Sequence, residues 1–176
     1  MSGKTNTKQL TVCAMLVALG EVLLGIGSIM EIADISMAVL ASLLCVIAVI
    51  EYGGSAPWLV FAATATLAFL LPNKGIALIY AAFFGYYPIL KEKIERLSRV
   101  KRWVLKELVF HVALVALIAA FLLAKSLFFP LVGDLTPTFL LLLVLLAEIV
   151  FVLYDIALTR LISLYLFRIR PRLRLK

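Results

Sequence analysis

Long apolar runs with very little charge recur along this chain, and they constrain its fold more than any other feature. Residues 35–50 contain no charged residue, and residues 138–159 contain only Glu148 and Asp155. A helix needs about 20 mostly apolar residues to cross the hydrocarbon core of a bilayer. The runs therefore predict an all-α protein that spans a membrane.

Composition supports lipid, rather than water, as the main solvent of the chain. Of its 176 residues, 65% are hydrophobic and 15% are charged, whereas soluble domains are about 45–50% apolar and about 25% charged. Helical spans with short connections would use nearly the whole length. We therefore expect residues 1–176 to form a single membrane domain, without a separate soluble domain.

The apolar runs divide into six expected spans, which together form a polytopic helical bundle. Gly25 and Gly27 are expected to break the first span, and Pro72 and Asn73 to end the third. After the fourth span, the periodic and charged residues 91–103 are expected to continue the helix along the membrane surface. The expected spans are residues 10–27, 35–50, 56–71, 75–90, 108–124 and 138–159.

The basic residues predict the orientation of the bundle. Fifteen of the 17 Lys and Arg residues lie in the first eight residues, in residues 91–106 or in residues 160–176, and only Lys74 and Lys125 lie elsewhere. Basic residues collect on the cytoplasmic side of a membrane. This pattern predicts a protein of the cell membrane with both termini in the cytoplasm, and it accounts for the net charge of +7 without a nucleic-acid partner.

Three titratable residues, Glu21, His111 and Glu148, are expected within the apolar spans. Such residues are costly in lipid and are functional candidates for that reason. His111 is the only histidine, which argues against a histidine-based metal site and favours a helix-packing hydrogen bond. Because the chain also lacks H-E-x-x-H and P-loop motifs, we expect no enzyme activity, no cofactor and no metal.

The turns expected on the outer face carry a mixed set of hydrogen-bond donors and acceptors. Glu31 and Asp34 lie in the first of these turns, Asn73 and Lys74 in the second, and Asp134 in the third. Polar groups around the rim of an apolar bundle are what a small polar ligand requires. We expect these five residues to bind substrate, although turns that face water are often polar for no other reason.

The first span contains two alanines four residues apart, in the sequence Ala14-Met-Leu-Val-Ala18. This pattern resembles the A-x-x-x-A stripe with which the substrate-binding S-components of energy-coupling factor (ECF) transporters dock their coupling subunit. The number of spans, the orientation and the chain length are similar to that family as well. The resemblance implies that Ala14 and Ala18 contact a partner protein, whereas ordinary packing within the bundle is the alternative.

The resemblance implies a binding subunit that takes up a vitamin-like or other small polar solute. Its partners would be a transmembrane coupling subunit and separate ATPase subunits. One alternative is a scaffold or assembly factor whose basic residues 91–106 and basic tail bind anionic lipid or a cytosolic protein. Another is a small secondary transporter in which Glu21 or Glu148 binds a proton.

The predicted orientation can be tested with single cysteines. A cysteine introduced at Lys74 should react in intact cells with a membrane-impermeant maleimide, whereas a cysteine at Ser98 should react only after the cells are opened, because it lies beside the basic residues 91–106. Reaction at Ser98 in sealed cells would overturn the orientation.

Overall fold

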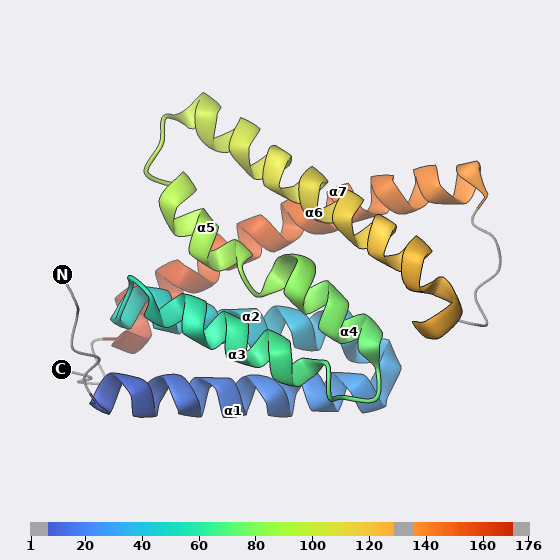
Figure 1. Ribbon diagram of the computed structural model, residues 1–176. Coiled ribbons are helices and arrows are strands. Elements are labelled where there is room, and N and C mark those ends of the chain that lie inside the picture. Colours follow the sequence, from blue (N-terminus) through green and yellow to red (C-terminus); the bar gives the residue numbers. More distant parts are fainter. Residues whose placement is uncertain (1–6, 129–135, 171–176) are drawn as a thin grey trace. The chain divides into compact units, whose positions relative to one another are not determined.

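The structure, a computed structural model, describes residues 7–128 and 136–170, and within these ranges it consists of helices joined by turns, with no strand (Figure 1). Four stretches are long and apolar enough to cross a membrane: Thr7–Met30, Asp34–Glu51, Arg99–Ala120 and Leu141–Arg168. The prediction of an all-α polytopic membrane protein is thus confirmed, while the number of six spans stays a prediction. By its internal contacts the chain divides into two compact units, Met1–Pro130 and Leu131–Lys176.

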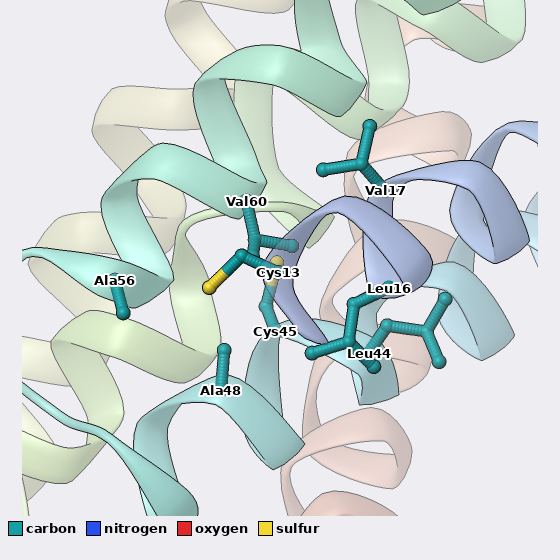
Figure 2. Packing of buried hydrophobic residues seen from close by; sticks show 8 residues of the cluster. All are labelled: Cys13, Leu16, Val17, Leu44, Cys45, Ala48, Ala56 and Val60. Atoms are coloured by element: carbon teal, nitrogen blue, oxygen red, sulfur yellow. The ribbon is translucent and has the colours of Figure 1, made fainter. Parts of the chain in front are cut away.

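The core of the first unit lies between α1 (Thr7–Met30), α2 (Asp34–Glu51) and α3 (Ala56–Ala68). The short 3₁₀ helix η1 (Glu31–Ala33) joins α1 to α2, and Gly53 and Gly54 turn the chain into α3 with positive φ angles of 60° and 57°. Glycine adopts this left-handed conformation at little cost. Figure 2 shows the side chains that meet between the three helices: Cys13, Leu16, Val17, Leu44, Cys45, Ala48, Ala56 and Val60.

Gly25 and Gly27 do not break the first helix, so this prediction is wrong. α1 continues through both glycines to Met30. A Cβ atom at Gly27 would lie 2.6 Å from Ile76 Cδ1 and 2.9 Å from Met37 Cβ. Gly27 is therefore a point of close contact between helices, because the missing side chain lets the neighbouring residues approach the backbone of α1.

The region of the expected fourth span is not one continuous α-helix. It consists of α4 (Lys74–Ile79), the π-helical turn η2 (Tyr80–Phe84) and α5 (Tyr87–Ile94). Pro88 stands in the first turn of α5 and has no N–H to donate to the preceding turn. At Gly85 an added Cβ would lie 2.5 Å from the ring of Phe61 on α3, so only glycine fits at this contact.

Aromatic side chains surround this interruption. The ring centroids of Phe61 and Tyr86 are 5.9 Å apart with an edge-to-face geometry, and those of Phe83 and Tyr87 are 4.8 Å apart. The buried hydroxyl of Tyr80 lies 3.4 Å from Cys45 Sγ on α2. Edge-to-face and tilted ring pairs contribute attraction beyond their buried area. Here the pair of Phe61 and Tyr86 holds the interrupted segment against α3, and the contact of Tyr80 with Cys45 joins it to α2.

The expected continuous helix over residues 91–103 is also not observed. α5 ends at Ile94, and α6 (Arg99–Phe128) begins after a short turn. The backbone N–H of Arg102 donates to the carbonyl of Ser98 at 2.9 Å, which starts the hydrogen bonds of α6. Serine is a preferred residue at the N-terminal boundary of a helix, and the periodic apolar residues on both sides conceal this boundary in the sequence.

The second unit contains α7 (Pro137–Leu164), followed by the π-helical turn η3 (Tyr165–Ile169). Its hydroxyl groups bond to carbonyls one turn earlier: Thr159 Oγ1 donates to Asp155 O at 2.8 Å, and Ser163 Oγ donates to Thr159 O at 2.9 Å. Such bonds satisfy a hydroxyl within its own helix. Thr159 and Ser163 can thus occupy this apolar helix because their hydroxyl groups are satisfied within it.

The contacts of the glycines in α1 predict opposite effects of two similar substitutions. Gly27→Ala should destabilise the fold by about 1–3 kcal/mol, because the added methyl group overfills a close contact. Gly25→Ala is the matched control, since the nearest atom to its added Cβ is 3.8 Å away; it should be neutral or stabilise by up to about 1 kcal/mol through helix propensity.

A thiol-reactive dye can follow thermal unfolding of both variants in detergent, because Cys13 and Cys45 are buried free thiols. Equal unfolding temperatures for the Gly27 and Gly25 variants would contradict the assignment of Gly27 as a close contact.

Candidate functional site

A hydrogen-bonded group of polar residues lies where the end of α1, the start of α2 and the start of α4 meet. We call Ser28, Asp34 and Asn73 the Asn73 cluster. The backbone N–H of Asn73 donates to Ser28 Oγ at 2.9 Å, and Asn73 Nδ2 donates to Asp34 Oδ2 at 2.7 Å. Asn73 is 45 positions from Ser28 and 39 positions from Asp34 in the sequence, so the cluster exists only because the helices fold together.

Local sequence places each member of the cluster. Asn73 is the N-cap of α4, and its Oδ1 accepts a hydrogen bond of 2.8 Å from Gly75 N; asparagine is a preferred residue at this position. Asp34 is the first residue of α2, where a negative charge interacts favourably with the helix dipole. Ser28 is buried in the last turns of α1.

Lys74 has a different environment from its neighbour Asn73. Its ammonium group donates to Phe69 O at 2.6 Å and to Leu71 O at 2.7 Å. Both carbonyls follow the end of α3, where the last carbonyls of a helix have no partner within the helix. Lysine commonly binds such carbonyls, so Lys74 ties α3 to α4.

The five predicted substrate-binding residues are therefore brought together only in part. Asp34 and Asn73 are in direct contact, and Lys74 bonds the end of α3. The backbone of Glu31 lies in η1, next to the start of α2, and Asp134 falls outside the residues that the structure describes. Ser28 is not among the five, although its hydroxyl stands in the first of the expected outer turns.

The Asn73 cluster has the chemical character of a site for a small polar molecule. Asn73 uses its backbone N–H, its Nδ2 and its Oδ1 within the protein, which fixes its position. The partly buried carboxylate of Asp34 supplies a negative charge, and the hydroxyl of Ser28 is both a donor and an acceptor. Such a set favours a solute that carries hydrogen-bond donors or a positive group.

The two alanines predicted to dock a partner lie on an exposed face of α1. Ala14 and Ala18 are both exposed, and so are the adjacent Met15 and Leu19, at 67% and 50%. The core side of α1 is formed instead by residues such as Cys13 and Leu16. Packing of the alanine stripe inside the first unit is therefore not observed.

A second polar group connects α5 to α6. We call Lys91, Glu95, Arg102 and Lys106 the Glu95 cluster. The carboxylate of Glu95 lies 2.6 Å from Lys106 Nζ, 2.8 Å from Arg102 Nη1 and 3.3 Å from Lys91 Nζ. One acidic side chain thus faces three basic side chains, and two of these, Lys91 and Lys106, are buried.

The charges around Glu95 change its acidity. Partial burial by itself raises the pKa of Glu95, but the hydrogen bonds from Lys106 and Arg102 and the positive charges of Lys106 and Lys91 outweigh this effect. Together they lower the pKa of Glu95 from 4.5 to about 2. The carboxylate therefore remains charged at physiological pH and can hold the two helices together.

Next to this cluster, the start of α6 exposes both basic and apolar residues. Arg99 and Lys101 are exposed, and Val100, Trp103 and Val104 are exposed at 75%, 45% and 61%. Tryptophan beside basic residues is typical of the membrane–water interface. This stretch has the composition of a surface that contacts anionic lipid headgroups.

The remaining titratable candidates lie on three different helices. Glu21 is on α1, His111 on α6 and Glu148 on α7. His111 Nδ1 lies 2.9 Å from the carbonyl oxygen of Glu107, one turn earlier in the same helix, and the ring is half exposed. The expected helix-packing role of His111 stays a prediction.

Comparison with known proteins gives no relative for this chain. No protein-family model matches it, and no curated protein and no solved structure shows significant similarity to it. The resemblance to ECF S-components therefore rests on the residues and the expected architecture of this chain. Function has to be inferred from the two polar clusters and the surfaces described above.

The contacts of the Glu95 cluster predict that the free energy of unfolding depends on the charge of the Glu95 carboxylate. Glu95→Gln should lower the free energy of unfolding at neutral pH by about 1–3 kcal/mol, because the basic side chains lose their charged acceptor. Since the folded pKa of about 2 is below the ordinary value of 4.5, this contribution is fully present above pH 4.5 and is lost as the pH falls toward 2. The difference between wild type and variant should shrink over the same range.

Glu92→Gln is the matched control, because Glu92 on α5 pairs with the exposed Arg96 in the turn that follows this helix. An exposed pair contributes about 0.2–1 kcal/mol, so this variant should unfold nearly as wild type does. Unfolding in detergent between neutral and acidic pH gives the comparison, and equal losses for both variants would contradict the special role of Glu95.

Proposed function

We propose that this protein is a membrane-embedded subunit that binds a vitamin-like or other small polar solute for uptake. Energy would come from a separate coupling subunit and separate ATPase subunits, as in the ECF transporters that the first helix resembles. The observation that carries the proposal is the Asn73 cluster, in which Asp34 and Ser28 are held by Asn73 at one end of the first unit.

The position of the cluster supports a role in solute capture. Its residues come from the η1 turn region and from the turn between α3 and α4, and the predicted orientation puts both turns on the outer face. A solute bound there would contact α1, α2 and α4 at once. Binding could then change how these helices pack, which a transport subunit requires in order to release its solute inside.

The exposed alanine stripe supports the proposed partner. Ala14 and Ala18 lie in the first half of α1, whereas Ser28 lies near its end. Small residues on a lipid-facing helix surface allow another helix to approach closely. One helix would thus carry a docking surface at one depth and a solute contact at another, so that a coupling subunit could sense the solute.

A second candidate function is a scaffold that binds anionic lipid through its cytoplasmic side. It is favoured by the exposed Arg99, Lys101 and Trp103 at the start of α6. Each basic residue near an anionic membrane surface contributes about 1 kcal/mol of binding. This surface is compatible with solute binding elsewhere, but a protein that acts only as a scaffold would bind no solute.

The proposal is tested by identifying the solute and removing one charge. Mass spectrometry of small molecules retained by the protein in mild detergent should reveal a stoichiometric solute. Asp34→Asn keeps an acceptor for Asn73 Nδ2 but removes the charge. It should weaken solute affinity roughly tenfold or more, the equivalent of about 1.5–3 kcal/mol for a lost charge-assisted contact.

The double variant Ala14→Trp with Ala18→Trp is the matched comparison. It should retain solute affinity and folding but abolish uptake and co-purification of coupling proteins, because bulky residues prevent a close helix contact. Absence of any retained solute, or an unchanged affinity in Asp34→Asn, would reject the solute-binding proposal. Normal uptake by the double variant would reject the docking surface.

A further inference from the structure

The mechanism proposed above leaves one acidic residue in the middle of α1 unused. Glu21 stands near the centre of an apolar helix that is long enough to cross a membrane. Its side chain is partly buried, and its Oε1 atom is fully buried without a hydrogen-bond partner among the described residues. A carboxylate in such a place is costly unless it is paired or neutralised.

A buried hydroxyl without a partner lies on the neighbouring helix α3. Thr64 is 1% exposed, and its Oγ1 makes no hydrogen bond within the described part of the chain. Thr66 on the same helix behaves normally, since its hydroxyl donates to Ala62 O at 2.8 Å. Threonine in a helix usually satisfies its hydroxyl in this way, so the arrangement at Thr64 requires a different explanation.

The glycines on either side of Glu21 in the sequence indicate which helix it faces. A Cβ atom at Gly20 would lie 3.4 Å from Thr64 Oγ1, and a Cβ atom at Gly25 would lie 3.8 Å from the side chain of Leu71, just after α3. Glu21 follows Gly20 directly and stands one turn before Gly25, on the same face. Glu21 is therefore on the side of α1 that faces α3.

We propose that Glu21 is a proton-binding site within the membrane, and that the hydroxyl of Thr64, which is not hydrogen-bonded to Glu21 in this structure, becomes its partner across the α1–α3 contact when the proton is exchanged. A hydroxyl can accept a hydrogen bond from the neutral acid and donate one to the carboxylate, so Thr64 can serve both protonation states. The proton is bound on the carboxyl oxygen and released from it, and no other bond changes. This inference does not depend on the solute-binding proposal.

The chemistry of the contact favours a proton over a metal cation. Ca²⁺ and Mg²⁺ gather about six or more oxygen ligands, whereas the described side chains at this contact provide one carboxyl and one hydroxyl group. The buried residues of α3 that follow Thr64 are Ala65 and Ala68, which have no polar side-chain atoms. A single carboxyl group in apolar surroundings is sufficient to bind a proton.

A hydrophobic carbodiimide tests this site directly in the full-length protein. The reagent takes up the acid proton on nitrogen, the carboxyl oxygen bonds to its central carbon, and the product rearranges to a stable N-acylurea. Labelling of Glu21, measured by peptide mass spectrometry, should be strongest at the acidic end of the pH range and fall roughly tenfold or more toward the alkaline end as the site releases its proton. Glu21→Gln should abolish the label.

Two threonine variants decide whether Thr64 is the partner. Thr64→Val removes the hydroxyl at nearly constant volume and should shift the loss of labelling to higher pH, since the carboxylate loses a donor. Thr66→Val is the matched control on the same helix, with an exposed hydroxyl that bonds its own backbone, and it should behave as wild type. Thr64→Ser keeps a hydroxyl and should also behave as wild type. This variant still tests the role of the hydroxyl if the valine variant misfolds.

Each outcome decides the proposal. The proposal is supported if labelling of the wild type falls as the pH rises, and if Thr64→Val is the only threonine variant in which this fall occurs at a higher pH. Labelling that is absent, or that is constant over the whole pH range, shows a carboxyl that does not exchange its proton at this contact and overturns the proposal. Equal shifts in the Thr64→Val and Thr66→Val variants would remove Thr64 from the site.

Discussion

The close approach of α1 to its neighbours at glycine positions is the constraint on which the first unit depends. In lipid, apolar helices gain little by burying apolar surface against each other, so their association depends on shape and on small residues that let backbones meet. Because Gly20 has no side chain, those of Thr64 and Leu44 can lie against it, and Met37 and Ile76 lie against Gly27 in the same way. These contacts determine which side chains of α2, α3 and α4 surround the inner face of α1.

Polar networks then close the two ends of this apolar unit. At one end, Asn73 connects the last turns of α1 to the first residue of α2. At the other end, Glu95 connects α5 to the first turns of α6. Both networks join helix termini, where backbone groups lack partners within the helix, and both leave the middle of the unit to apolar and aromatic packing. Glu21 and Thr64 are the exceptions to this division, and we assign them a function for that reason.

Several features of the sequence had more than one physical meaning, and this limited the predictions. Glycine marks both helix breaks and close helix contacts, so the sequence alone could not show that α1 passes through Gly25 and Gly27. Residues 91–103 have a helical period on both sides of Ser98, which hides the boundary between α5 and α6. The sequence placed Asp34, Asn73 and Lys74 in turns on one expected face, but it could not show that Asn73 bonds to Asp34 while Lys74 bonds back to the end of α3.

By itself, the sequence determined the all-α membrane class, the approximate position of the four long spans and the expected orientation. These properties depend on the hydrophobicity and charge of neighbouring residues, which can be summed along the chain. Only the tertiary structure decided that Asn73 meets both Ser28 and Asp34, that Ala14 and Ala18 face outward, and that the buried hydroxyl of Thr64 lies beside α1 without a partner among the described residues. The reason is physical: a hydrogen bond requires two atoms within about 3 Å, and the helix packing that sets such distances between residues far apart in sequence depends on the shapes of all the contacting side chains.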